Sequence, residues 1–194
     1  MSQKLLRDAS LYRVLLEIDE DLAAQVQAAG CPCGGALHSA RYPRRPRGAL
    51  ARTPPAYHWR LSFCCDQDGC RRRRTPPSVR FLGRKVFLGA VVVLVSALAH
   101  GPTPERLRRL RELVGVSRRT VERWRGWWLA TFTTTPVWRE ARARLVRVAQ
   151  ESLPASLLAR FDGDETTRLR HCLTFLSPVT TRSCVGWSPL IEGL

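Results

Sequence analysis

Five of the seven cysteines gather between residues 31 and 70, in a pattern that predicts a metal site. Cys31 and Cys33 are followed by two glycines, and Cys70 closes the turn Asp-Gln-Asp-Gly-Cys. Thiolates from two tight turns, separated by a strand-forming linker, are ligands that structural Zn²⁺ takes in a tetrahedron. We find no export signal at the start of the sequence. Clustered cysteines in such a chain favour a metal over a disulfide framework.

Two neighbouring cysteines compete for one position in this site. Cys64 and Cys65 are adjacent, and adjacent side chains of a strand point to opposite faces, so both cannot easily reach one ion. We favour Cys65, with Cys31, Cys33 and Cys70 as the other ligands. A catalytic zinc would need an open coordination position and a general base, which no His/Glu pairing here indicates. The substitutes left open for one thiolate are Cys64, His38 and His58.

The charge of the chain predicts a polyanionic partner. There are 32 Lys and Arg residues against 16 Asp and Glu, a net charge of +16. Residues 31–85 hold 13 basic and two acidic groups, and residues 101–150 hold 12 basic and four acidic groups. Each phosphate that such a surface neutralises releases condensed counterions, which favours binding. The two basic blocks coincide with the two regions that carry motifs.

A run of four arginines follows Cys70 directly. Arginines in such a run are not buried without partners, and their guanidinium groups suit phosphate oxygens. Because the run is attached to the predicted metal turn, we expect it to contact DNA phosphates. Its members are Arg71, Arg72, Arg73 and Arg74.

Residues 84–132 read as three helical segments with short breaks. Nearly every residue from 86 to 98 is apolar, so the first segment should be the central helix of a bundle. The second begins with Thr103 as N-cap and Pro104 in the first turn. Gly115 supplies a left-handed residue for the break, and the valine after it fills the angle between two helices. This is the pattern of a helix-turn-helix.

The third segment is the candidate recognition helix. Val121, Trp124 and Trp128 recur at helical spacing and should face the core. Arginine side chains on the other face could bond guanine O6 and N7, worth about 1–3 kcal/mol of discrimination for each good pair. The outer residues near its start are Ser117, which caps the helix, and Arg118, Arg119, Glu122 and Arg123.

We therefore expect a mostly α-helical protein in five parts. They are an N-terminal amphipathic helix (1–30), a zinc-ribbon-like basic module with short β-strands (31–83), a three-helix bundle with the helix-turn-helix (84–132), C-terminal helices (133–178) and a flexible tail (179–194). In the finer detail, we expect a helix capped by Ser10 over residues 10–29, a strand over 57–63, and helices over 136–150, 156–160 and 165–177. Asp162 or Asp164 should cap the last of these helices, and Cys172 should lie in its apolar face.

The ordered motifs resemble the DNA-binding front ends of bacterial insertion-sequence transposases and their accessory proteins. The resemblance covers residues 31–132: a cysteine pair, a basic linker, a second pair running into RRRRTPPSVRF, and a helix-turn-helix ending in VSRRTVERWRGWW. It implies a zinc ribbon and a helix-turn-helix that bind transposon ends. By this resemblance the zinc ligands would be Cys31, Cys33, Cys65 and Cys70, and the recognition helix would carry Arg118, Arg119 and Arg123.

We expect a non-catalytic, sequence-specific binder of double-stranded DNA. No strand pattern after position 132 brings together three carboxylates for strand transfer, so a separate transposase subunit is an expected partner. The longest apolar run without charge, residues 86–99, has 14 residues, fewer than the roughly 18–20 that span a bilayer. We expect a cytoplasmic, nucleoid-associated protein. The alternatives are a zinc-stabilised adaptor, a transcriptional regulator, and a Mg²⁺ nuclease using Asp162, Asp164 and Glu165.

Overall fold

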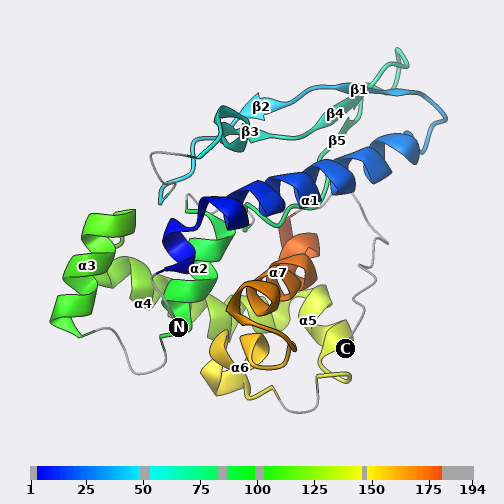
Figure 1. Cartoon of the computed structure of the whole chain (residues 1–194). Helices are drawn as coiled ribbons and strands as arrows, with labels where there is room; N and C mark the ends of the chain where they lie inside the picture. Colours follow the sequence, from blue (N-terminus) through cyan, green and yellow to red (C-terminus); the bar gives the residue numbers. More distant parts are fainter. Residues whose placement is uncertain (1–3, 49–52, 83–86, 99–102, 146–147, 181–194) are drawn as a thin grey trace.

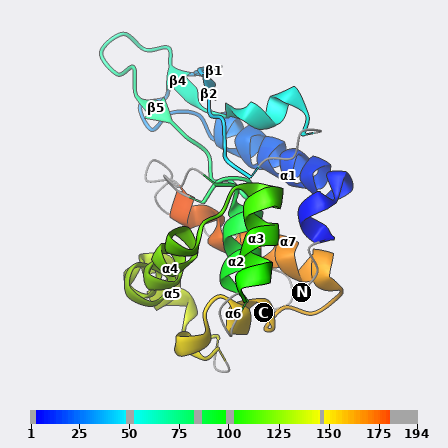
Figure 2. The ribbon, with the colours of Figure 1, turned by 90° about the vertical axis from the view of Figure 1, so that its left-hand side faces the viewer.

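The computed structural model describes residues 4–48, 53–82, 87–98, 103–145 and 148–180. It is mostly helical, as expected, with short antiparallel strands. The strands run along one side of the long helix α1 (Ala9–Ala28), and the other helices lie on its opposite side (Figure 1). Figure 2 shows the same two-sided arrangement from the α3 side. The other helices are α2 (Gly89–Ser96), α3 (Pro104–Val114), α4 (Arg118–Gly126), α5 (Pro136–Ala141), α6 (Ala155–Leu158) and α7 (Glu165–Leu176).

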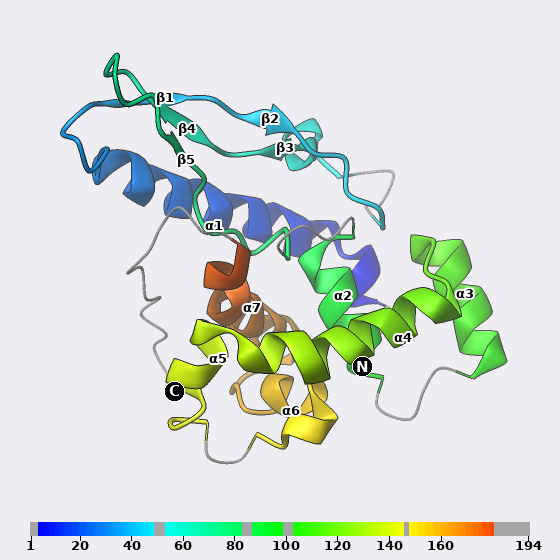
Figure 3. The same ribbon diagram turned by 180° about the vertical axis from the view of Figure 1, so that it is seen from behind.

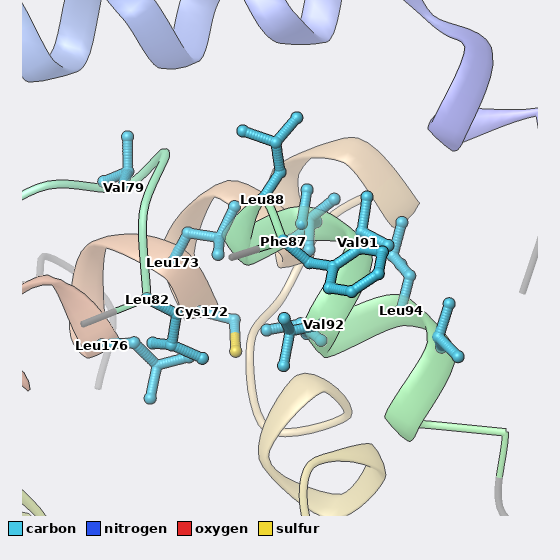
Figure 4. Close-up of a cluster of buried hydrophobic side chains, with 14 of the residues drawn as sticks. Val79, Leu82, Phe87, Leu88, Val91, Val92, Leu94, Cys172, Leu173 and Leu176 are labelled. Atoms are coloured by element: carbon cyan, nitrogen blue, oxygen red, sulfur yellow. The ribbon is translucent and has the colours of Figure 1, made fainter. Parts of the chain in front are cut away.

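Helix α2 is the centre of the main core, which confirms the interpretation of the apolar run. All eight of its residues are buried. Phe87 and Leu88 before it and Cys172 and Leu173 of α7 pack around it (Figure 4). Residues 84–86 and 99–100 of the expected helix lie outside the described residues. Among the described residues, no helix is long and apolar enough to cross a membrane.

Helix α3 begins and ends, and helix α4 begins, where the sequence predicts. The Thr103 side chain accepts a hydrogen bond from the Arg106 N–H, and the Ser117 side chain accepts one from the Thr120 N–H. Gly115 has φ +67°, a left-handed conformation that costs a glycine little. Val116 is fully buried between the two helices.

The core-facing side of α4 is aromatic. Val121, Trp124 and Trp128 are buried, as predicted. Beyond α4 the chain continues as a five-residue π turn (Trp127–Thr131) and a 3₁₀ turn (Phe132–Thr134). Trp127, which the sequence could not place, is half-buried against Trp128, with ring centroids 4.8 Å apart.

The strands form two small antiparallel sheets. In the first, β4 (Phe63–Cys65) lies between β1 (Leu37–Ser39) and β5 (Arg73–Arg74); in the second, β2 (Tyr42–Pro43) pairs with β3 (Trp59–Arg60). The expectation of one strand over residues 57–63 is only partly right. A 3₁₀ turn occupies Pro55–His58 because Pro55 sets the first helical φ, and the strands start at Trp59.

Helix α1 belongs to both cores. Leu11 and Leu15 face the main core, while Ala23 and Val26 pack with the cysteines and Phe63. The expected cap was wrong: Asp8, not Ser10, caps the helix, because its carboxylate accepts a hydrogen bond from the Ser10 N–H at 2.9 Å. The hydrogen bond from the Ser10 hydroxyl lowers the pKa of Asp8. A carboxylate at this position also interacts favourably with the helix dipole.

The C-terminal helices are shorter than predicted. Helix α5 starts at Pro136, as predicted, but ends at Ala141. There the Leu145 N–H donates to the Ala141 and Arg142 carbonyls and closes a turn instead. Helix α6 ends before Arg160, and Asp164, rather than Asp162, caps α7. Cys172 is buried as expected. Residues 181–194 of the expected tail lie outside the described residues. Short 3₁₀ turns complete the chain at Leu5–Arg7, Gln150–Ser152 and Ser177–Thr180.

Candidate metal centre and basic surfaces

Four cysteine sulfurs converge at one end of the first sheet. The Sγ atoms of Cys31, Cys33, Cys65 and Cys70 all lie within 4.8 Å of one another. The Cys31–Cys70 sulfur distance is 3.7 Å and the Cys33–Cys65 distance is 3.4 Å. Four sulfurs bound to one Zn²⁺ at about 2.3 Å would be about 3.8 Å apart. These residues could therefore hold one tetrahedral metal ion.

The environment of the sulfurs disfavours ionisation of the thiols in the absence of a cation. Burial, together with hydrogen bonds to the neighbouring cysteines, raises the pKa of the Cys65 thiol to about 12. A cluster of this kind keeps its protons unless a positive charge stabilises the thiolates. Cys65 is fully buried, whereas Cys33 is exposed, so an ion would be held at the surface with a buried side toward α1.

Two turns bring the sulfurs together. In the first, the Gly34 N–H donates to the Cys31 carbonyl at 2.8 Å; in the second, the Cys70 N–H donates to the Gln67 carbonyl at 3.1 Å. Gly35 is the closest approach between them. A Cβ at Gly35 would lie 2.7 Å from the Cys65 sulfur and 2.5 Å from Gln67 Cγ, so only glycine fits there.

The other proposed ligands lie elsewhere. The Cys64 thiol donates to the Arg71 carbonyl at 3.4 Å and is not in the cluster. His38 instead lies 3.7 Å from an Asp66 carboxylate oxygen, and His58 is in the 3₁₀ turn before β3. The alternation of side chains in β4, on which the choice of Cys65 rested, separates Cys64 from Cys65 in this way.

The arginine run beside the second turn is partly engaged. Arg71 bonds to Asp68 at 2.6 Å, and Arg73 lies over the ring of Tyr42 at 5.8 Å. Arg72 is exposed, and Arg74 in β5 is half-buried. The run therefore offers fewer free cations than its sequence suggests.

The outer face of α4 carries three arginines and one glutamate, and the glutamate pairs with only one of the arginines. Arg118 pairs with Glu122 at 3.0 Å. Arg119 and Arg123 are exposed and one helical turn apart, and no ion pair among the described residues involves either of them. Like charges at this spacing repel each other by a few tenths of a kcal/mol, a cost that a bound anion would remove.

Comparison with known proteins gives no relative. No family model, curated protein or solved structure matches this chain.

The residues of the nuclease alternative do not form a site. Asp164 accepts the Thr167 N–H at 2.8 Å as the cap of α7, and Asp162 and Glu165 are exposed. In the part of the chain that the structure describes, the four cysteines are the only cluster that could hold a metal. Helix α1, which the adaptor alternative needs as a docking surface, has its apolar face buried within this chain.

Sequence reasoning missed the polar contact that joins the two cores. Arg80 is fully buried, and its Nε donates to Asp19 of α1 at 2.7 Å. Its terminal nitrogens donate to the Ala56 and Trp59 carbonyls, both at 3.2 Å. Asp19 occupies the apolar stripe of α1, one turn after Leu15. An acidic residue at that place was the available signal.

Proposed function

We propose that this chain is a non-catalytic, sequence-specific DNA-binding protein with one structural Zn²⁺. The observation that carries the proposal is the exposed pair Arg119 and Arg123 on the first turns of α4, opposite a buried face of Val121 and Trp124. A capped helix held rigidly on its inner side, with unpaired guanidinium groups outside, suits the major groove. In this reading α3 and α4 are a helix-turn-helix and α4 is the recognition helix.

The ion pairs of α3 and α4 support the assignment of α4 as the recognition helix. In α3, Arg108 pairs with Glu112 at 3.0 Å and Arg109 pairs with Glu105. This pairing offsets two of the four arginines of α3, which keeps a net charge of +2, whereas α4, with four arginines and one glutamate, has a net charge of +3. Glu122 then holds Arg118 against the helix. The Glu122 carboxylate could also accept a hydrogen bond from a cytosine amino group.

Zinc is the metal that the donor set favours. Four thiolates in a tetrahedron suit Zn²⁺ or an iron–sulfur cluster, and a single ion fits sulfurs within 4.8 Å of one another. When bound, the ion would supply folding free energy and no chemistry. Cys31, Cys33, Cys65 and Cys70 would hold it, and Arg72 beside it would contact phosphate.

We further propose a recognition or accessory role in a mobile element. This rests on the resemblance of the ordered motifs to transposase front ends and requires a separate catalytic subunit. A transcriptional regulator with the same two binding surfaces is the other form of this proposal. DNA selected by the protein distinguishes them, because transposon ends recur as terminal inverted repeats.

The test compares single arginine variants on a duplex that the wild-type protein selects from a random pool. Arg123→Ala should lower discrimination between the best site and single-base variants about 10-fold at one position. Arg125→Ala is the matched control, since Arg125 is exposed on the same helix but points about 160° away from Arg123. Arg72→Ala should weaken binding to all sequences equally and reduce the salt dependence by about one phosphate. Equal effects of Arg123→Ala and Arg125→Ala on discrimination would contradict the proposal.

A further inference from the structure

A second set of arginines lies beside α3 and α4, in the segment of residues 44–48, here named the arginine arm. Its backbone is fixed at both ends. The Arg44 N–H donates to the His58 carbonyl at 2.6 Å, and the Leu88 N–H donates to the Arg47 carbonyl at 3.3 Å. The first bond ties the arm to the residue before β3, and the second ties it to the residue before α2.

The side chains of the arm alternate between inward and outward positions, as they do in an extended chain. Arg44 turns inward, with its guanidinium 5.3 Å from the centroid of the Phe81 ring, and Pro46 is buried. Arg45 and Arg47 point outward and are exposed. Among the described residues, no carboxylate forms an ion pair with either of them. The two side chains are therefore presented on one side by a backbone that is already ordered.

The end of the arm lies against α2 and the last residue of α3. A Cβ at Gly48 would lie 3.2 Å from a methyl group of Val91 and 3.5 Å from Val114, the last residue of α3. Gly48 has φ +76°, so a glycine is also required there for backbone reasons. In Figures 1 and 3 the chain after β2 descends toward the end of α3 from which α4 begins.

We infer that Arg45 and Arg47 enter the minor groove of duplex DNA next to the major groove that α4 reads. This deepens the proposed function and rests on it. Side chains two residues apart in an extended chain are about 6.6 Å apart, close to the roughly 6.8 Å of two base-pair steps. Arginine is favoured in the narrow, electronegative minor groove of A·T-rich sequence. An arm beside a recognition helix lets the protein read two adjacent grooves at once, as the N-terminal arm and the third helix of homeodomains do together.

The experiment uses the full chain, purified with its metal, and the duplex that it selects from a random pool. In the segment that flanks the α4 site, A·T pairs are replaced by G·C or by inosine·cytosine pairs. The G·C pair places an amino group in the minor groove, whereas inosine·cytosine leaves the minor groove like A·T and changes only the major groove. For the wild-type protein, G·C should weaken binding about 10-fold and inosine·cytosine should restore it.

The double variant Arg45→Ala/Arg47→Ala should bind all three duplexes equally. Its matched control is Arg142→Ala/Arg144→Ala, which removes two exposed arginines of the same spacing from the turn after α5, at the other end of α4. The control should keep the preference for A·T and inosine·cytosine. If the arm variant keeps it too, or if inosine·cytosine behaves like G·C, the inference is wrong while the proposed function stands. If no duplex is selected, both are wrong.

Discussion

The Arg80 guanidinium and the Asp19 carboxylate form an ion pair that is removed from solvent, with Nε and Oδ2 2.7 Å apart and side chains 0% and 1% exposed. Asp19 also accepts from the Ser78 hydroxyl and the Val79 N–H, both at 2.6 Å. One carboxylate of α1 therefore fixes the segment that connects β5 to α2. Since Arg80 also donates to the carbonyls of Ala56 in the 3₁₀ turn and Trp59 in β3, the pair positions the second sheet relative to α1.

Asp19→Asn should lower the free energy of unfolding by about 3 kcal/mol, because it leaves the Arg80 charge buried without its counterion. Urea unfolding of the metal-loaded protein measures this change. Asp21→Asn, at an exposed position of the same helix, should change it by less than about 0.5 kcal/mol. The pair Asp19→Leu/Arg80→Met should be destabilised less than the sum of its two single changes. Additive losses would show that the two groups do not interact.

The sequence predicted features that depend on nearby residues and missed the Arg80–Asp19 pair, whose partners are far apart in the chain. The caps of α3 and α4, the left-handed Gly115 and the buried stripe of α4 follow from residues within a turn or two of each other, so they were predicted correctly. Arg80 lies between apolar neighbours, and its burial depends on a carboxylate 61 residues earlier in the chain. Local patterns contain no information about such a partner.

The cysteine site was predictable because each ligand turn is local. The spacing of Cys31 and Cys33 and the alternation in β4 identify the four sulfurs without any long-range information. The need for Gly35 was not visible, since the atoms that exclude a side chain there come from residues 65–67. The exposure of Arg45 and Arg47 was also hidden, because it depends on the burial of Pro46 between them.

Zinc should be lost when a cysteine of the cluster is replaced and retained when a cysteine outside the cluster is replaced. Wild-type protein should carry one zinc per chain by native mass spectrometry, and Cys65→Ser should carry none. Cys64→Ser is the matched control, because the adjacent thiol lies outside the cluster and bonds to the Arg71 carbonyl. A chelator should lower the melting temperature of the wild-type protein to that of Cys65→Ser, since metal binding contributes folding free energy. Equal zinc content in the two variants would refute the ligand assignment.

Two glycines flanking α4 should respond in opposite directions to alanine. Gly126 has helical φ −57° and ψ −38°, and a Cβ there meets nothing within 4 Å. Gly126→Ala should therefore stabilise the protein by about 0.5–1 kcal/mol. Gly115→Ala should destabilise it by about 1 kcal/mol, because φ +67° is left-handed. Thermal unfolding of both variants checks the sign, and a loss of stability in Gly126→Ala would mean that α4 does not have this geometry.

Alkaline pH should unfold the protein through its buried tyrosines. Burial raises the pKa of Tyr12 to about 12, and it also raises the pKa of Tyr57, whose ring packs against Tyr12 at 5.6 Å. In the unfolded chain a tyrosine ionises near pH 10. The fold thus prefers the neutral phenol, so the stability from this preference is complete below about pH 10 and is lost as the pH rises toward 12.

Urea midpoints measured across this pH range test the prediction. The Tyr12 hydroxyl donates to the Leu6 carbonyl at 3.0 Å, so Tyr12→Phe should cost about 1 kcal/mol at neutral pH. The Tyr57 hydroxyl is buried without a hydrogen-bond partner among the described residues, so Tyr57→Phe should cost nothing there. Each variant removes one ionising group and should reduce the alkaline loss. If the double variant unfolds over the same pH range as wild type, another group controls the transition, because no phenol would then be left to ionise at either position.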